Sequence, residues 1–484
     1  MNSGLVLIIV LPALAALVAT FLRAVPVQLG VLIGTALLHL LCTATLWSTG
    51  AAVPTAGLIG LDALGLLVLS LVSLLFFAAA IYSVPYLRDG THDEAAAPQR
   101  FVPCLLAFLA AMSLVTVSRN LALMWAAVEA TTLASAPLIY FYRRPGSLEA
   151  TWKYLLICSV GIALALLGTF FLGVASTTPA GDGAGLGLDD VLAVAMRLDH
   201  RWLHAAFVLV LVGYGTKMGL APLHTWLPDA HSQAPSPVSA LLSGALLNCA
   251  LLGILRFYAI CVAGGEAEFA QRLLLVLGFA SLLVGAGLLL WQRDYKRLLA
   301  YSSVENMGVI AIGLGIGGTA TYGALLHVVN HSFAKGALFL LSGNVLRAYG
   351  STAAADVRGV SRRLPVSAAL LTAAAFAIGG SPPFGPFVSE LTIFLGAMRS
   401  SLPCLGVVFV VLLGVAFVGI ASTLFPMLQG DSDRVLQEGK PARTEPWLTI
   451  ISPAVLVLAV LALGIYVPAS LDALLRRAAE VLRQ

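Results

Sequence analysis

The sequence predicts an all-α membrane protein that crosses the bilayer about fourteen times and contains two inverted five-helix repeats. Of its 484 residues, 60% are hydrophobic and only 10% are charged, whereas soluble domains carry about 25% charged residues. Windows of about 20 apolar residues, each long enough to cross a hydrocarbon core of about 30 Å as a helix, recur along the whole chain. Two of these windows are interrupted by glycine and proline, which predicts broken helices. An ordinary soluble domain is therefore excluded.

Fourteen windows meet this criterion, and short polar segments connect them. The twelfth, 365–399, is too long for one straight helix and contains the run GGSPPFGPF, so we expect a single broken helix there. The windows leave no room for a soluble domain. The predicted spans are 3–22, 27–47, 61–83, 101–118, 121–142, 154–176, 204–226, 237–262, 271–291, 298–316, 321–346, 365–399, 403–428 and 447–467.

The distribution of basic residues predicts the orientation of these spans. The loops that follow odd-numbered spans contain most of the lysine and arginine residues, including Arg143, Arg144 and Arg297. Because basic loops remain in the cytoplasm, we expect both termini on the non-cytoplasmic side of a bacterial inner membrane. The segments 182–202 and 468–484 look amphipathic, and we expect them to lie along the membrane surface.

The two interrupted windows indicate an internal duplication. The seventh contains KMGLAPLHTWLP with Pro222 and Pro228, and the twelfth contains GGSPPFGPFVSE with Pro382 and Pro383. Each run also carries one ionisable residue that would lie inside the membrane. Interrupted helices at corresponding places in two halves are typical of transporters built from inverted repeats.

The repeats divide the chain into four expected parts. Residues 1–100 hold helices one to three, and residues 101–262 hold helices four to eight, which form the first repeat. Residues 263–428 hold helices nine to thirteen, which form the second repeat. Residues 429–484 hold helix fourteen and the C-terminal amphipathic segment.

Ionisable residues inside the predicted spans are the main functional signal. A charged group at mid-bilayer costs about 2.5–3.5 kcal/mol on insertion scales, so such residues are candidates for an ion path. Histidines and an aspartate also follow the interruption of the seventh span. The candidates within spans are Glu129, Lys217, Glu305, His327, His331, Lys335 and Glu390, and those at the end of the seventh span are His224, Asp229 and His231.

The eleventh span carries three of these candidates on one helix face. His327, His331 and Lys335 are spaced i, i+4 and i+8, so they form a stripe about 12 Å long. A stripe of titratable groups can pass protons, directly or through water. The alternative is that these side chains only form hydrogen bonds between helices, as polar groups in membranes often do.

Lys217 and Glu129 are expected to form a buried ion pair, since each would lower the cost of the other's charge. A lysine balanced between desolvation and a nearby carboxylate can change its protonation state when that carboxylate moves or is neutralised. The pair would then act as a switch. The alternative is a static salt bridge that only fixes helix packing.

The remaining polar and cysteine residues give no sign of a cofactor. We expect Asn248, Arg256, Tyr301 and Asn344 to satisfy backbone or loop groups. The cysteines occur singly, without the spacing of iron–sulfur, zinc or haem ligands, so neither a cofactor nor a metal is expected. The dispersed basic residues do not indicate nucleic acid. The six cysteines are Cys42, Cys104, Cys158, Cys249, Cys261 and Cys404.

Three sequence runs carry a resemblance to a known family. KMGLAPLHTWLPDAHSQAPSPVSALLSG (217–244), LLAYSSVENMG (298–308) and HVVNHSFAKGALFLLSGNV (327–345) resemble the antiporter-like, proton-translocating subunits of respiratory complex I. These subunits are shared with multisubunit cation/proton antiporters and membrane-bound hydrogenases. The segment 125–169 is most similar to component F of hydrogenase-4, of the formate hydrogenlyase group.

The resemblance implies two half-channels joined by a hydrated polar axis in the middle of the membrane. The sequence departs from the family at Asn248, where several relatives have lysine, and at Glu305, where relatives commonly have serine. The first departure would require histidines and water to bridge the axis. By resemblance, the family's proton-transfer positions are Glu129, Lys217, His231, His327, His331, Lys335 and Glu390, to which we add Glu305.

These observations predict a subunit that moves protons, or sodium, across the cytoplasmic membrane. The driving redox reaction would occur in partner subunits with nickel–iron and iron–sulfur centres, and a shift of Glu129 would lower the proton affinity of Lys217. One alternative is a subunit of a cation/proton antiporter or ion-coupled uptake system without a redox partner. Another is a non-conducting scaffold that binds lipid and partners.

Overall fold

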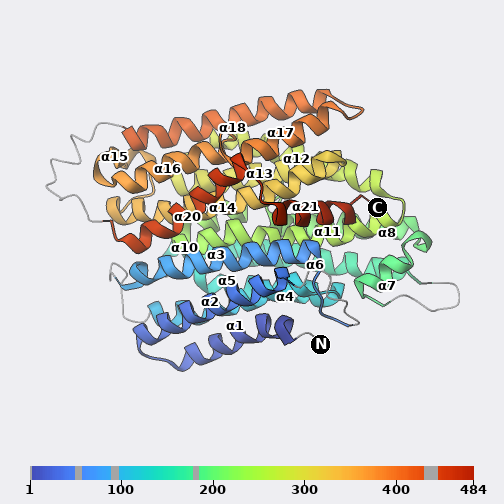
Figure 1. Ribbon diagram of the computed structural model, residues 1–484, viewed down its shortest axis with the longest axis horizontal. Coiled ribbons are helices and arrows are strands. Elements are labelled where there is room, and N and C mark those ends of the chain that lie inside the picture. The colour runs from blue at the N-terminus through green and yellow to red at the C-terminus, as the bar shows by residue number, and fades with distance from the viewer. Residues whose placement is uncertain (1–2, 49–56, 89–96, 178–184, 430–444, 484) are drawn as a thin grey trace.

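The computed structural model describes residues 3–48, 57–88, 97–177, 185–429 and 445–483. Within these ranges the chain is almost entirely helical, and the helices lie side by side in one bundle (Figure 1). The described residues contain three isolated β-bridges and no strand. Both termini lie at the same end of the bundle (Figure 1), as an even number of crossings requires.

The helices follow the predicted spans closely. Before the first repeat lie α1 (Ser3–Phe21), α2 (Val25–Ser48) and α3 (Ala63–Arg88). The helices in the segment predicted to form the first repeat are α4 (Ala97–Val117), α5 (Leu121–Ile139), α6 (Pro145–Ala175), α7 (Leu188–Ala193), a 3₁₀ turn (Ala195–Arg197), α8 (His200–Met218), α9 (Trp226–Gln233), α10 (Ser236–Leu241), a π-helical turn (Leu242–Leu246) and α11 (Leu247–Ala263).

The segment predicted to form the second repeat follows α11. Its helices are α12 (Ala267–Leu289), α13 (Tyr295–Ile316), α14 (Thr319–Tyr349), a 3₁₀ turn (Ala354–Asp356), α15 (Val360–Arg363), α16 (Pro365–Ile378), α17 (Gly385–Met398) and α18 (Cys404–Gln429). The chain ends with α20 (Trp447–Ile465) and α21 (Ala469–Val481).

Twelve described helices are long and apolar enough to cross a membrane. The two remaining crossings are the broken ones, α8 with α9 and α16 with α17. The fourteen predicted crossings are therefore accounted for, including both interruptions. Most boundaries differ from the expected ones by a few residues, and the largest difference is at α6, which begins at Pro145 rather than at residue 154.

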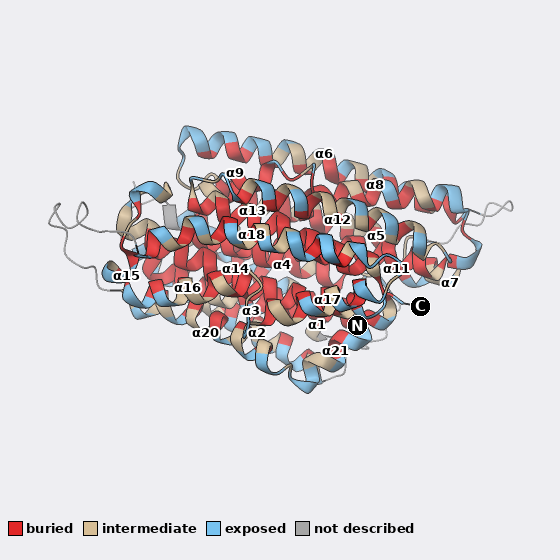
Figure 2. Cartoon of the chain, turned by 90° about the horizontal axis from the view of Figure 1, so that it is seen from above, coloured by how far each residue is buried: buried red, intermediate tan, exposed pale blue. Residues whose placement is uncertain are grey.

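The most polar helices occupy the centre of the bundle. In the 18-residue window of 319–349 that defines the span, the mean hydropathy is only 1.3 and every residue is buried, whereas in that of 404–429 the mean hydropathy is 2.9 and 28% of the residues are buried. Figure 2 shows the buried residues in the middle of the bundle and the exposed ones on its outer helices. Polar side chains in a membrane need protein partners, so helices that carry them lie inside while purely apolar helices can face lipid.

Both broken helices stop at a glycine with a left-handed backbone. In the first break α8 ends at Met218, and Gly219 has φ +86°. In the second, Gly380 has φ +67°, shortly after α16 ends. Such φ values favour glycine over any residue with a Cβ. Each break also contains one cis prolyl bond, before Pro222 and before Pro383.

The four predicted helix-breaking prolines do not all lie in breaks. Pro222, Pro382 and Pro383 lie between the half-helices. Pro228 instead lies in the first turn of α9, where the missing backbone N–H does not disrupt the helix. The expectation that it breaks the chain is therefore wrong.

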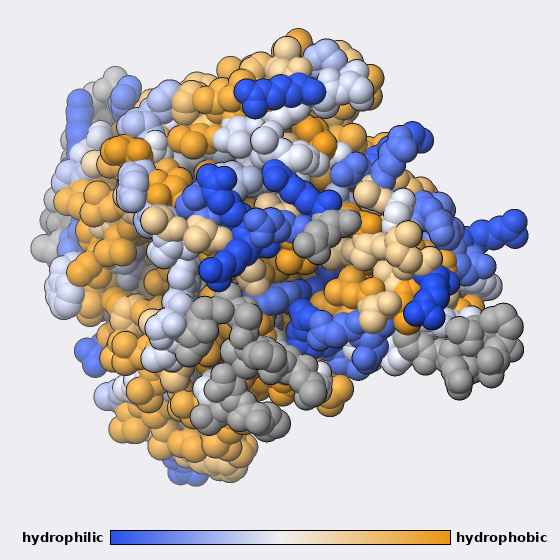
Figure 3. Space-filling view, turned by 45° about the vertical axis from the view of Figure 1, so that its right-hand side comes forward, coloured by the Kyte–Doolittle hydropathy of each residue, from blue (hydrophilic) through white to orange (hydrophobic). Residues whose placement is uncertain are grey.

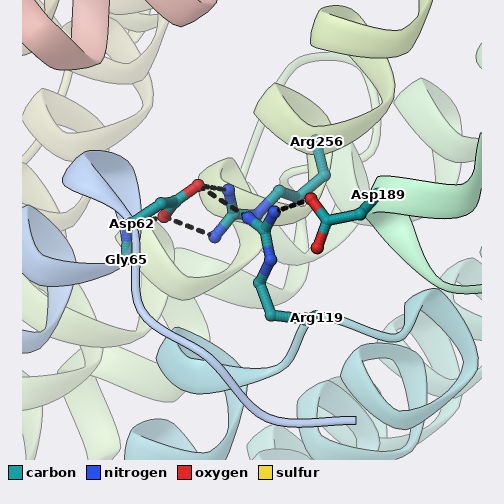
Figure 4. Close-up of polar contacts among 5 residues, drawn as sticks. All are labelled: Asp62, Gly65, Arg119, Asp189 and Arg256. Carbon is teal, nitrogen blue, oxygen red and sulfur yellow. Dashed lines mark hydrogen bonds and ion pairs between the residues drawn. The ribbon is translucent and has the colours of Figure 1, made fainter. Parts of the chain in front are cut away.

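An ion cluster ties the N-terminal helices to the first repeat at one end of the bundle (Figure 4). Arg256 of α11 donates to both carboxylate oxygens of Asp62, which precedes α3. Arg119 forms a second ion pair with Asp62 at 3.0 Å and a third with Asp189 of α7. Burial would raise the pKa of Asp62, but the guanidinium groups of Arg256 and Arg119 lower it to about 2. The expectation that Arg256 satisfies a loop group is confirmed.

Asn344, near the C-terminal end of α14, also ties several helices together. Its amide nitrogen donates to Ser367 Oγ at 2.9 Å and to the Thr449 carbonyl at 3.2 Å, and its oxygen accepts from Tyr82 at 2.9 Å. The single side chain therefore joins α3, α14, α16 and α20, as expected for a residue that satisfies neighbouring groups.

The C-terminal segment forms the amphipathic helix α21. It buries Leu474, Leu475 and Ala478 and packs against α3 and α14. Tyr322 of α14 donates a hydrogen bond to Asp472 at 2.7 Å. Figure 3 shows hydrophilic side chains gathered at the end of the bundle that holds the termini and hydrophobic ones over the adjacent flank. A location of α21 on the membrane surface stays a prediction.

Candidate functional site

The predicted transport residues lie on helices from α5 to α17. We call these residues, together with Asn248, the polar row. All of its members except Glu129 are buried, with exposed fractions between 0% and 7%. The polar row consists of Glu129, Lys217, His231, Asn248, Glu305, His327, His331, Lys335 and Glu390.

Lys217 lies at the last turn of α8, directly before the first break. Its ammonium group donates to Thr132 Oγ1 at 2.5 Å and to the Tyr154 hydroxyl at 2.9 Å. The same nitrogen lies 4.8 Å from the centroid of the Tyr154 ring, a cation–π contact. Buried cations need such partners because desolvation otherwise disfavours the charge.

The predicted ion pair between Glu129 and Lys217 is indirect. Thr132, one turn after Glu129 on α5, donates its hydroxyl hydrogen to Glu129 at 3.2 Å while accepting from Lys217. Ser159 of α6 donates to the other carboxylate oxygen at 2.9 Å. Among the described residues no direct ion pair joins Glu129 to Lys217, so the expected contact is wrong. The two charges are coupled through one hydroxyl.

Glu129 also differs from the prediction in its exposure. Its side chain is half-buried, and so is Ser159 beside it. The position of Glu129 on α5 turns it toward the outside of the bundle, which hydropathy along the helix could not indicate. The Glu129 carboxylate therefore lies between the buried members of the polar row and the outer face of the bundle.

Asn248 joins α11 to α14 near the centre of the polar row. Its amide nitrogen donates to the Gly244 carbonyl and to Ser332 Oγ, both at 2.7 Å. Gly244 belongs to the π-helical turn, and such turns occur frequently at functional sites. Ser332 is the neighbour of His331, so Asn248 connects to the stripe through a hydroxyl rather than through a second ammonium group.

The rings of His231 and His331 are buried, and their nitrogen atoms lack hydrogen bonds to the described protein. Neither ring nitrogen of either residue has a hydrogen-bond partner within the described part of the chain. The His231 ring stacks on Phe339, with centroids 4.9 Å apart. Buried polar atoms are nearly always paired with protein or with water. The ring nitrogens of these two histidines therefore require hydrogen-bond partners from outside the protein, such as water.

Lys335 is held by α13. Its ammonium group donates to the Leu299 carbonyl at 2.7 Å and also to Ser302 Oγ. Lys296, at the start of the same helix, is 1% exposed and donates to the Ala234 carbonyl at 2.7 Å. Lys296 lies between the predicted spans 271–291 and 298–316, where a loop is expected. No local signal distinguishes it from its half-buried neighbour Arg297.

Asp229 holds the half-helix α9 in place. It forms ion pairs with Lys153 of α6 at 3.0 Å and with Arg297 of α13 at 3.1 Å. Asp229 is therefore part of a clamp near the end of the bundle and not part of the row. His224 is likewise apart from the row, where it contacts the Tyr301 ring edge-on.

The second half of the row contains a continuous hydrogen-bonded chain. Asn306 donates to Glu305 and accepts from His327 Nε2, with 3.0 Å between the latter atoms. His327 Nδ1 lies 2.9 Å from Ser389 Oγ of α17. This chain joins α13, α14 and α17. No sequence signal singles out Asn306 or Ser389, because asparagine and serine are common helix-packing residues in membrane proteins.

The bonding of His327 is compatible with either protonation state. The carbonyl oxygen of Asn306 can only accept, so Nε2 carries a hydrogen. Nδ1 can accept from Ser389, or it can donate to Ser389 when the serine turns its hydrogen to the Pro386 carbonyl, 2.9 Å away. His327 can therefore gain a proton without losing a hydrogen bond.

The predicted stripe on α14 is present, but its members have different partners. His327 is bonded to α13 and α17, Lys335 is bonded to α13, and His331 between them has no protein partner in the described ranges. The polar row is thus a series of hydrogen-bonded groups, interrupted at His231 and His331, and not one unbroken chain. Within the described residues, no group of three or more His, Cys, Asp or Glu is arranged to hold a metal ion.

Comparison with known proteins agrees with this architecture. The family model for the transmembrane region of NADH:quinone oxidoreductase and Mrp antiporters matches residues 118–416. The hydrogenase-4 component F homolog of Methylacidiphilum infernorum is 38% identical over 84% of this chain and 85% of its own length.

Solved structures give the same result. A chain of respiratory complex I from Thermus thermophilus is 25% identical, with a TM-score of 0.81 over 99% of both chains. A chain of the Mrp complex from Dietzia sp. has a TM-score of 0.86 at 20% identity, over 100% of this chain and 98% of that chain, which shows a common fold. The chain therefore belongs to the NADH:quinone oxidoreductase/Mrp antiporter family, as an antiporter-like membrane subunit of the complex I and hydrogenase-4 type.

Proposed function

We propose that this chain translocates protons across the bacterial inner membrane as a subunit of a redox-driven complex. The observation that carries the proposal is the polar row itself, in which seven ionisable residues are buried: Lys217, His231, Glu305, His327, His331, Lys335 and Glu390. Each buried charge costs several kcal/mol, which a purely structural bundle would not retain. A non-conducting scaffold is the weaker explanation for the same reason.

The cycle begins at the face that carries Glu129. A change of charge in a neighbouring subunit shifts or neutralises this half-buried carboxylate. Thr132 then loses its acceptor and turns, which weakens its interaction with Lys217. Lys217 releases its proton because its cation has lost part of its stabilisation.

The proton continues along the buried stripe. His231, His331 and Lys335 receive it in turn, with water between the ring nitrogens that lack protein partners. His327 accepts it without losing a hydrogen bond and passes it toward Glu390. Because Asn248 cannot carry a proton, it orients Ser332 beside His331 in this proposal.

The partners follow from the relatives. The most similar protein described above is a component of hydrogenase-4, so we propose neighbouring membrane subunits and, indirectly, nickel–iron and iron–sulfur subunits. Both termini face away from the cytoplasm in this arrangement. The chain divides as proposed at residues 100, 262 and 428, with one half-channel in each repeat. The ion is a proton, with sodium as the alternative.

A second candidate is a cation/proton antiporter subunit without a redox partner. The fold shared with the Mrp complex favours it. Purification of the chain from its native membrane distinguishes the two functions. Subunits with nickel–iron and iron–sulfur centres support the redox-driven pump, whereas small antiporter subunits alone support the second candidate.

Replacing Lys217 tests the proposed function. In vesicles that contain the assembled complex, we expect Lys217→Ala to abolish acidification by this subunit while redox turnover in the partners continues. Arg272→Ala serves as the control, because this exposed basic side chain pairs, among the described residues, only with Glu268, one turn away on the same helix. Unchanged pumping in Lys217→Ala would contradict the proposal.

A further inference from the structure

The second helix break contains a space that only a glycine can leave open. A Cβ on Gly380 would lie 2.0 Å from Glu390 Oε2 and 2.9 Å from its Cδ. Carbon atoms in contact stay about 3.5–4.0 Å apart. The Glu390 carboxyl group therefore fills the volume that a side chain at position 380 would occupy. We call this space beside Gly380 the carboxyl seat.

The backbone around the carboxyl seat cannot retreat to make room. On one side, a Cβ on Gly464 of α20 would lie 1.9 Å from the Pro383 carbonyl. On another, a Cβ on Gly379 would lie 2.6 Å from the Phe417 ring of α18. Close backbone packing on α20 and ring packing on α18 fix the break from both directions.

A third neighbour enters the same break from α14. A Cβ on Gly385, the first residue of α17, would lie 2.2 Å from Asn330 Oδ1. This oxygen is buried and has no hydrogen-bond partner among the described residues. Two polar side chains, from α14 and α17, thus reach into a break whose glycines provide the space for them.

The carboxyl seat holds the side chain that follows the last residue of the hydrogen-bonded chain from Glu305 to Ser389. Glu390 follows Ser389, which is bonded to His327. Glu390 is 7% exposed, whereas Ser389 and His327 are fully buried. Glu390 is therefore the residue next to the end of the hydrogen-bonded chain that retains some exposure.

We propose that Gly380 is a positioning residue for proton transfer, because it keeps the seat open for the Glu390 carboxyl. This inference rests on the proposed function, in which Glu390 is the last protonation site. In the seat, the carboxyl takes the proton that arrives through His327 and Ser389 and releases it to water at the surface. A methyl group at position 380 would force the side chain into another rotamer, away from this position.

The first test measures redox-driven proton pumping by the assembled complex. We expect Gly380→Ala to reduce pumping between about tenfold and about 100-fold, since misplacing a reacting group by about 1 Å can cost that much. Gly350→Ala is the matched control. Gly350 has φ +72° and no atom within 4 Å of an added Cβ, so alanine there meets the same backbone penalty without a clash. Equal losses in the two variants would overturn the proposal.

A conservative double variant provides the rescue. Glu390→Asp shortens the side chain by one methylene, about 1.5 Å, and so withdraws the carboxyl from an alanine at position 380. We expect Gly380→Ala/Glu390→Asp to pump more than Gly380→Ala alone. If the two single losses simply multiply in the double variant, the positions are independent and the seat has no role.

Thermal stability of the complex separates this inference from the proposed function. Gly380→Ala should lower the melting temperature in the presence of Glu390, and the added change Glu390→Ala should restore much of it by removing the clash. If Glu390→Gln pumps normally while this coupling is present, the proposed function of Glu390 is wrong but the seat exists. If the coupling is absent while Glu390→Gln abolishes pumping, the seat is wrong and the function stands.

Discussion

The two broken helices use the same backbone device for different side chains. In the first break, the left-handed Gly219 faces the apolar Leu227, whose Cδ1 would lie 2.5 Å from an added Cβ. The ionisable residue, Lys217, comes before that glycine and is fixed by two hydrogen bonds. In the second break, the left-handed Gly380 faces the ionisable residue itself, Glu390.

This difference is consistent with different roles for the two halves in the proposed function. The first half holds a cation whose partner network reaches the half-buried Glu129 on the outer face, so a neighbouring subunit can act on it. The second half holds its carboxyl groups inside the bundle. Glu305 is 2% exposed and connects to His327 through Asn306. In the proposed function, the first half would receive the signal from the neighbouring subunit and the second half would pass the proton on.

The largest expected effect comes from breaking the second half at His327. We expect His327→Gln to reduce pumping by about 100-fold, because glutamine can keep hydrogen bonds to both neighbours but cannot take a proton. Redox-driven acidification of vesicles measures the loss. His39→Gln is the matched control. His39 is a buried histidine of α2 that is bonded to two serines, at 2.8 Å and 2.9 Å, outside the polar row.

Full pumping by His327→Gln would show that the chain from Glu305 to Ser389 only fixes helix packing. The contrast between the two halves would then disappear, because neither would need a proton carrier at this point. Equal losses in His327→Gln and His39→Gln would also contradict the account, since they would indicate a general effect of removing a buried histidine.

A smaller effect is expected from uncoupling the first half at Thr132. Thr132→Val keeps the shape but removes the hydroxyl between Glu129 and Lys217, so we expect pumping to fall by about tenfold, the equivalent of one charge-assisted hydrogen bond. Thr132→Ser should restore it. Pumping per redox turnover is the measurement. A Val variant that pumps as well as the Ser variant would rule out coupling through this hydroxyl.

The smallest effect on pumping is expected at the ion cluster, which lies outside the polar row. Arg256→Gln should lower the free energy of unfolding by about 2 kcal/mol, the size of a hydrogen bond to a charged group, because Arg119 still pairs with Asp62. The surviving complex should pump normally per turnover. Thermal denaturation in detergent checks the first result and vesicle acidification the second. Loss of pumping in the intact variant would place Arg256 on the path.

The stability that the ion cluster contributes should also depend on pH, which distinguishes this cluster from the polar row. The pKa of Asp62 is about 2, below its ordinary value of 3.8, so the pair stabilises the fold fully above pH of about 4 and less as the pH falls toward 2. We expect the stability difference between wild type and Arg256→Gln to be constant from pH 7 to about 5 and to shrink only below about 4. A difference that shrinks near neutral pH would point to another group.

Much of the fold could be predicted because membrane insertion leaves strong marks on a sequence. Apolar windows gave the crossings, and the glycine and proline runs gave both breaks. The cost of burying a charge singled out Lys217, Glu305 and Lys335, which are indeed buried. These signals are local, so a linear reading can detect them.

The parts that could not be predicted depend on how helices are rotated and packed. Nothing near Glu129 indicates that it turns outward or that Thr132 separates it from Lys217. Lys296 and Arg297 are adjacent and chemically similar, yet only the first is buried. The seat beside Gly380 is formed by residues from several helices. Such features arise only when the bundle assembles.

The central claim is that Lys217 and Glu390 act in series on one path. The most direct test is the number of protons moved per electron in vesicles that contain wild type, Lys217→Ala, Glu390→Gln or the double variant. If the two sites lie on one path, the ratio falls equally in all three variants, because a path that is already blocked cannot be blocked again. If the double variant loses the sum of two separate decrements, or if the ratio never changes, the account is contradicted.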